Sequence, residues 1–365
     1  MLSLLAVLLV AAFGGGVVGG VVALTLDGGP GPTPTPTAVA AATPVPGDAT
    51  RLRAAIARVL PTVVTVVAEL PLQAVAGGVL ERENFGSGIV IGSGYVLTNF
   101  HVVDGASRVE IALTTGERRA ARVVADDSPF HDLAILAVPS EGLRVATLGD
   151  SDALQLGDPV AAISGGLVTF ENQAKVGVVS ATRVAFPRPG LIMEDMIQTD
   201  AAVNHGDSGG ALVNLDGEVI GILTTVVRGT PDGQIVEGVG LAHSVNSLRD
   251  VIEAVVATGR NPRPRHGIER VGKQHLPVTA ELAAERGLPV RSGALIISVE
   301  PTSPAGRAGV RNGDIVVGVD GFAVDETHPL VSHLAALSGD GRAEFQILRD
   351  GAQVVVGVIP EAGQG

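Results

Sequence analysis

Short aliphatic runs broken by glycine fill the chain from Val63 to Val245, among them VVTVVAEL, GSGIVIG, RVEIAL, PVAAIS and EVIGILTTVV. Runs of this length between turn residues predict strands, and their close spacing predicts an all-β sandwich or barrel. Aromatic residues make up only 2% of the chain, so the interior must be built from aliphatic side chains. The Asp216-Gly217 pair predicts a hairpin with a type I′ turn.

Helices are predicted at both ends of this β-rich segment. Residues 50–60 have Thr50 as N-cap and end before Pro61, and a second helix starts with Asn246 as N-cap and ends at Gly259. We therefore expect a first domain over residues 50–259. A chain of 365 residues is too long for one ordinary domain, and strand patterns return over residues 265–362 with one helix near 329–337, which predicts a second.

The chain carries no charged residue before Asp27. An apolar run of this length can span a bilayer as a helix, so we expect a transmembrane anchor over residues 1–27 and an extended proline-rich linker over 28–49. A cleaved signal peptide is the alternative, although such peptides usually have a basic start, which is missing here. The interpretation places the catalytic domain on the extracytoplasmic side of a cytoplasmic membrane, crossed once.

Charge and cysteine content exclude several classes of function. The net charge is -13 and no basic cluster occurs, so nucleic acid is not expected as a partner. With no cysteine, the chain has no thiol nucleophile and no thiolate metal site. Neither a metal nor another cofactor is expected.

Three polar residues, one in a glycine-framed turn and two at strand ends, suggest nucleophilic catalysis. Ser208 lies in Gly-Asp-Ser-Gly-Gly, where the glycines permit a tight turn that exposes the hydroxyl, and the amides of Gly206 and Ser208 would stabilise an oxyanion. A serine needs a base and an orienting acid. His101 follows one predicted strand and Asp132 precedes another, and the order His, Asp, Ser is that of trypsin-like enzymes.

With its motifs TNFHVV, HDLAIL and QTDAAVNHGDSGGAL, the chain resembles the HtrA/Deg serine proteases. The resemblance implies a mostly β fold: a two-barrel trypsin-like domain followed by a PDZ domain, a small β-barrel with helices. It implies His101 as general base and acid, Asp132 as the residue that fixes its tautomer, and Ser208 as nucleophile. The implied function is cleavage of unfolded or damaged proteins by a homotrimer. A membrane-tethered chaperone or scaffold with little proteolysis is the alternative.

The sequence departs from the family beside the nucleophile. Family members commonly have Asn where this chain has Asp207, which is the version found in digestive proteases, where the aspartate pairs with an N-terminus created by cleavage. No such terminus is evident here, so we expect an arginine or backbone donors around Asp207, because a buried unpaired carboxylate is costly. We expect His205 to face solvent and His131 to be a loop residue, whereas His243 replaces an apolar residue without evident reason.

Specificity follows from a position six residues before the serine. In trypsin a carboxylate there selects Lys and Arg, but this chain has Ala202, so cleavage after basic residues is not expected. The resemblance implies small aliphatic side chains before the scissile bond, in a pocket lined by Ile222, Leu223 and Thr224.

The segment from Ser303 to Gly321 resembles the PDZ signature. PDZ modules add a peptide to a sheet edge and hold its terminal carboxylate on loop amides. We expect that loop at His266, Gly267 and Ile268, with the C-termini of proteins as ligands. A PDZ that only braces the protease is the alternative.

Overall fold

The computed structural model describes residues 46–75, 78–166, 172–188, 190–226, 238–337 and 341–362. The predicted anchor over residues 1–27 lies outside the described residues, as does the predicted linker up to residue 45. None of the helices in the described ranges combines the length and the apolar character that crossing a membrane requires.

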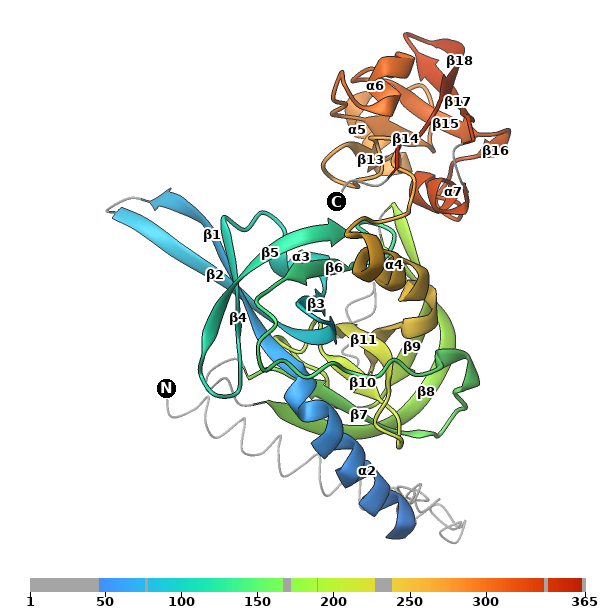
Figure 1. The fold of residues 1–365 in the computed structure, drawn as a ribbon. Coiled ribbons are helices and arrows are strands. Elements are labelled where there is room, and N and C mark those ends of the chain that lie inside the picture. The colour runs from blue at the N-terminus through green and yellow to red at the C-terminus, as the bar shows by residue number, and fades with distance from the viewer. Residues whose placement is uncertain are drawn as a thin grey trace, which may run out of the picture. The chain divides into compact units, whose positions relative to one another are not determined.

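The first six strands close into a barrel in the order β1-β2-β3-β6-β5-β4 (Figure 1, blue to teal). Val64 and Val66 of β1 pack with Val90 and Val96 inside it, while Val63 and Ile89 point to the opposite face. This alternation of side chains is that expected for a strand. The strands are β1 (Val63–Val75), β2 (Gly78–Gly92), β3 (Tyr95–Thr98), β4 (Arg108–Ala112), β5 (Arg118–Asp126) and β6 (Ala134–Ala137).

The next six strands close a second barrel in the order β10-β11-β12-β9-β8-β7 (Figure 1, green to yellow). Val160 and Ala162 of β7 lie in its own core, whereas Ile163 joins a cluster that includes Ile89 of the first barrel. Both strand faces are therefore buried where the barrels meet. The strands are β7 (Pro159–Ser164), β8 (Gln173–Arg188), β9 (Leu191–Thr199), β10 (Ala211–Val213), β11 (Val219–Val226) and β12 (Gly240–Ser244).

The helices around the barrels begin earlier than the sequence indicated. Helix α2 (Pro46–Val59) starts four residues before Thr50 and continues into the 3-10 turn η1 (Leu60–Thr62). Proline favours the first helical turn, and the acidic Asp48 stabilises it. Helix α4 (Val245–Thr258) has Ser244 rather than Asn246 at its N-cap and ends, as predicted, at Gly259 in the left-handed conformation. A further 3-10 turn, η2 (Ser151–Ala153), precedes β7.

The predicted hairpin joins β10 to β11, but its turn is not type I′. Gly217 has a φ of +72°, whereas Asp216 is absent from the described non-glycine residues with positive φ. The side chain of Asn214 accepts hydrogen bonds from the amides of Asp216 and Glu218, each at 3.0 Å. A longer loop, organised by asparagine, therefore replaces the two-residue turn.

The second domain contains a six-stranded sheet in the order β13-β14-β15-β17-β18, with β16 paired to β15. Its core includes Phe345, Ile347 and Val316. The predicted helix near residues 329–337 is present as α7. The strands are β13 (His275–Pro277), β14 (Ala294–Ile296), β15 (Ile315–Val319), β16 (Phe322–Ala323), β17 (Ala343–Arg349) and β18 (Ala352–Val358), and the helices are α5 (Ala280–Arg286), α6 (Pro304–Ala308) and α7 (Leu330–Ala336).

Candidate active site

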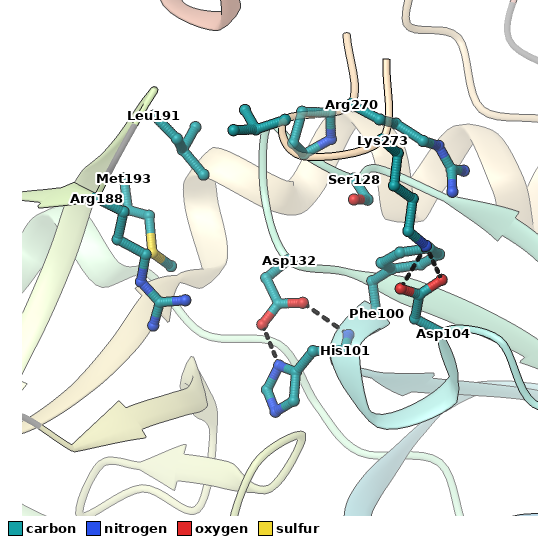
Figure 2. A pocket seen from close by; sticks show the side chains of 12 residues that line it. Phe100, His101, Asp104, Ser128, Asp132, Arg188, Leu191, Met193, Arg270 and Lys273 are labelled. Carbon is teal, nitrogen blue, oxygen red and sulfur yellow. Dashed lines mark hydrogen bonds and ion pairs between the residues drawn. The ribbon is translucent and has the colours of Figure 1, made fainter. Parts of the chain in front are cut away.

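His101 and Asp132 meet at the end of the first barrel. His101 lies in the short helix α3 (Phe100–Val103), directly after β3, and its ring Nδ1 pairs with Oδ2 of Asp132. Oδ1 of the same carboxylate accepts the main-chain amide of His101 at 2.9 Å. Figure 2 shows both contacts. The carboxylate thus fixes the ring through Nδ1 and leaves Nε2 for another partner.

Asp132 is held ionised although it is buried. Burial by itself would raise the pKa of its carboxyl group, but the hydrogen bonds from the ring and amide of His101 outweigh this effect and keep the pKa below its ordinary value. The main chain is fixed too, because the carbonyl of Asp132 accepts the amide of Phe100 at 3.1 Å and the side chain of Asn99 at 2.8 Å. The carboxylate is therefore preorganised as a hydrogen-bond acceptor.

Ser208 lies in the loop before β10, in the second barrel. Its Oγ donates to the carbonyl of Thr224 at 3.0 Å, and no hydrogen bond joins it to His101 among the described residues. Gly209 has a φ of +85°, and a Cβ atom there would lie 2.1 Å from the carbonyl oxygen of Ser87. A glycine is therefore required beside Ser208, as the motif suggested.

Thr224 of β11 connects Ser208 to Asp132. Its carbonyl accepts the hydroxyl of Ser208, and its own Oγ1 donates to Oδ2 of Asp132 at 3.1 Å. From the sequence, Thr224 was expected to line a substrate pocket. Nothing in the neighbouring residues indicated its hydrogen bonds to Ser208 and Asp132. Through Thr224, the structure brings His101, Asp132 and Ser208 into one hydrogen-bonded chain.

The two amides expected to stabilise an oxyanion remain available. No main-chain or side-chain acceptor within the described ranges binds the amide of Gly206 or that of Ser208. The loop is held instead by Ser87 of β2, whose amide donates to the carbonyl of Ser208 at 2.7 Å and whose Oγ donates to that of Gly206 at 2.8 Å. Ser87 gave no signal in the sequence, because its partner Gly206 lies 119 residues away.

Asp207, between these two amides, has several partners. Ser164 donates to its Oδ1 at 2.6 Å, and the ammonium group of Lys175 and the amide of Asn204 lie 2.5 and 2.6 Å from Oδ2. Of the two kinds of partner expected, an arginine or backbone donors, the structure has a backbone donor, and the positive charge comes from a lysine. His205, as expected, is exposed.

The residues expected to line the substrate pocket differ in how far solvent reaches them. Ala202 is exposed, while Ile222 and Leu223 are fully buried in the cores. A cavity of about 340 Å³ opens beside His101 and Asp132 (Figure 2). Its other lining residues come from four segments of the chain: Phe100, Asp104, Ser128, Pro129, Arg188, Leu191, Met193, Arg270, Val271 and Lys273.

A largely buried polar cluster lies next to Asp132. His131 is in the loop before β6, as expected, and its Nδ1 lies 2.7 Å from Oδ2 of Asp127. Arg263 pairs with Oδ1 of Asp127, also at 2.7 Å. The ring of His243 packs edge-on against that of His131, with 5.9 Å between the centroids. Burial, followed by repulsion from His131, lowers the pKa of His243 to about 3, so its ring is neutral.

The loop expected to hold a peptide carboxylate holds an internal one. The amides of His266 and Gly267 both donate to Glu269, with Gly267 lying 3.0 Å from Oε2. Burial would raise the pKa of Glu269, but the contacts with the side chain and amide of His266 outweigh it and lower that pKa. Ile268 is fully buried in the core of the second domain. Two amides of the loop therefore bind a carboxylate, and that carboxylate belongs to the chain itself.

Comparison with known protein families supports the presence of both predicted domain types. A model described as a trypsin-like peptidase domain matches residues 86–222, and a PDZ domain model matches residues 264–359. The structure resembles that of the HtrA-type protease AlgW with a decapeptide, with a TM-score of 0.54, 28% identity, and coverage of 85% of this chain and 98% of that one. A serine endoprotease from Yersinia pestis gives 0.52 at 28% identity, covering 85% and 97% of the two chains.

Curated relatives are proteases. A probable periplasmic serine endoprotease, DegP-like, from Halomonas elongata is 36% identical over 78% of this chain but only 59% of its own length. DegP from Escherichia coli is 35% identical over 74% of this chain and 56% of its own. The chain thus spans less than two thirds of the length of these two relatives.

The serine protease Do-like HtrA of Lactococcus lactis subsp. lactis is 35% identical over 74% of this chain and 69% of its own length. The same two domain types occur here in the order that the motifs predicted. The chain belongs to the HtrA family of trypsin-like serine proteases with a PDZ domain.

Proposed function

We propose that this chain is a serine endopeptidase with His101, Asp132 and Ser208 as its catalytic triad. The observation that carries the proposal is the hydrogen-bonded chain from the His101 ring through Asp132 and Thr224 to Ser208, beside the two available amides. A binding module would need neither the buried carboxylate on the imidazole nor the glycine-framed serine.

The geometry supports an acyl-enzyme mechanism. The Ser208 hydroxyl leaves the Thr224 carbonyl and donates to Nε2 of His101, the nitrogen that Asp132 leaves free. As Oγ attacks the peptide carbonyl, its proton passes to His101, and the amides of Gly206 and Ser208 stabilise the oxyanion. The intermediate collapses when the amine leaves with that proton. Water then attacks the ester by the same proton transfers in reverse and restores the serine.

Unfolded or damaged proteins outside the cytoplasm are the proposed substrates, and residues 1–27 are proposed to anchor the chain. The names of the relatives from Halomonas and Escherichia include "periplasmic", which supports this location. Ala202 in place of an acidic residue supports cleavage after small aliphatic rather than basic residues. A homotrimer is proposed from family resemblance. The proposed domains are the protease over residues 50–259 and the PDZ domain over 265–362.

The PDZ domain is proposed to bind the C-termini of proteins at the loop of His266, Gly267 and Ile268. Because Glu269 already accepts the amides of His266 and Gly267, a peptide carboxylate would have to displace it. The resting domain is thus capped by its own side chain, which would favour ligands able to compete for both amides.

Cleavage of denatured casein by the full-length chain in mild detergent tests the proposal. Wild type should degrade casein and react with a fluorophosphonate probe at Ser208, whereas Ser208→Ala should do neither. If the two proteins both protect casein from aggregation and neither cleaves it, the chaperone alternative holds and the endopeptidase is refuted.

A further inference from the structure

A largely buried ion pair involves Asp207, the residue directly before Ser208. The ammonium group of Lys175 lies 2.5 Å from Oδ2 of Asp207, and their side chains are 20% and 5% exposed. Lys175 lies on β8 and Ser164, the other side-chain partner of Asp207, on the neighbouring strand β7. Two adjacent strands of the second barrel therefore present a positive charge and a hydroxyl to one carboxylate.

Every polar group of Asp207 is engaged. Its amide donates to the carbonyl of Asn204 at 3.1 Å, and its carbonyl accepts the amide of Gly210 at 2.8 Å. With the carboxylate bound by Lys175 and Ser164, the residue has little freedom to rotate. The two amides that would stabilise the oxyanion belong to its immediate neighbours, Gly206 and Ser208. A shift of Asp207 would move both.

The charge on Lys175 is needed because the carboxylate is buried. A buried carboxylate without an opposite charge is unstable and tends to turn towards water, and such a turn would rotate the adjoining peptides. In digestive proteases the compensating ammonium group is a chain end released by cleavage. In this chain a side chain already provides the ammonium group.

We propose that Lys175 is a positioning residue for the oxyanion site: its ammonium group holds Asp207, and through it the amides of Gly206 and Ser208, without any cleavage of the chain. The inference rests on the proposed endopeptidase function. It extends that function by making the competent arrangement of the loop depend on an internal ion pair.

Lys175→Met in the full-length chain tests the inference. Loss of a single oxyanion donor lowers kcat by roughly 10²–10³, so kcat on a quenched peptide should fall about 100-fold or more, with KM within about threefold. Affinity for a peptide boronate, which mimics the tetrahedral intermediate, should fall with kcat. In proteins that carry Ser208→Ala and so leave the peptide uncleaved, the affinity for a substrate peptide should change by no more than about threefold when Lys175→Met is added.

Rescue distinguishes positioning from general damage. Lys175→Arg keeps the charge and should retain activity within about tenfold. Adding Asp207→Asn to Lys175→Met removes the unpaired carboxylate. The double variant should have a kcat at least tenfold higher than that of Lys175→Met alone. If Lys175→Met does not fold, Lys175→Arg carries the test, and a folded arginine variant with a 100-fold loss would overturn the proposal.

The chain contains a matched control in its second domain. Arg349 pairs with Asp314 at 2.7 Å, and these side chains are 21% and 1% exposed, so Arg349→Met breaks an equally buried ion pair away from the oxyanion loop. It should leave kcat within about threefold. The inference would be overturned if Arg349→Met and Lys175→Met lost equal kcat, or if Lys175→Met folded and remained fully active. In either case, cleavage by the wild type would still support the proposed function. A wild-type chain that does not cleave would refute both.

Discussion

Replacing His243 by leucine should remove much of the acid sensitivity of the first domain. The imidazole is 1% exposed, neither ring nitrogen has a hydrogen-bond partner among the described residues, and His131, Asp132, Arg188 and Asp127 act on it electrostatically. Burial is the main reason that its pKa falls from 6.5 to about 3. The folded chain therefore stays neutral at this site under conditions in which the unfolded chain takes up a proton.

The sign and size of the effect follow from this difference. Between pH 6.5 and 3 the unfolded chain binds more protons at residue 243, so the free energy of unfolding falls as the pH falls. From pH 7.5 to pH 5.0 the loss from this one group is about 2 kcal/mol, at 1.36 kcal/mol per pKa unit. Leucine does not titrate, and the variant should lose that much less stability over the same interval.

Urea denaturation followed by circular dichroism at pH 7.5 and 5.0 measures the difference. His205→Leu is a suitable control, because His205 is exposed and its replacement leaves the buried cluster intact. The reasoning would be refuted if wild type and His243→Leu lost equal stability on acidification, or if the control reproduced the effect.

Three further predictions concern Thr224, the cluster around Asp127, and the PDZ loop. Thr224→Val removes a hydrogen bond to a charged group, worth about 1.5–3 kcal/mol, and should lower kcat/KM about ten- to hundredfold, whereas Thr224→Ser should not; equal losses would contradict a role for the hydroxyl. Burial would raise the pKa of the Asp127 carboxyl group, but its contacts with His131 and Arg263 outweigh this effect and lower that pKa. Asp127 therefore contributes stability above pH 3.8, and this contribution is lost as the pH falls further. Asp127→Asn should flatten this acid loss in denaturation curves, and an unchanged slope would refute the assignment. Glu269→Gln should bind a C-terminal peptide more tightly than wild type by fluorescence anisotropy, and weaker binding would argue that Glu269 supports the loop rather than blocks it.

The sequence predicted elements whose cause is local or repeated. Alternating aliphatic residues predicted the strands, and glycine predicted the end of α4 because only a left-handed residue fits there. The N-cap was wrong because Asn246 reaches instead to the side chains of Asp150 and Asp152, at 2.7 and 3.0 Å. These partners lie almost a hundred residues away, and a local pattern does not contain them.

The site shows the same limit. The motif around Ser208 predicted the turn in which it lies, because a glycine frame is a local requirement. The partner of Asp207 depended on which strand lies behind the loop, and the register of β7 and β8 decides that Lys175 reaches it. Glu269 was missed because the motif for a carboxylate loop does not indicate whether a nearby acidic side chain already fills it.

The position of Ser87 couples catalysis to the integrity of the whole domain. Ser87 belongs to the first barrel, yet it binds the carbonyls of Gly206 and Ser208 in the second, and its Oγ also accepts the amide of Gly165 at 2.9 Å. If the barrels begin to separate, the loop behind the reactive hydroxyl loses its support at once. Any loosening of the contact between the barrels would therefore disturb the loop that carries Ser208 before either barrel itself unfolds.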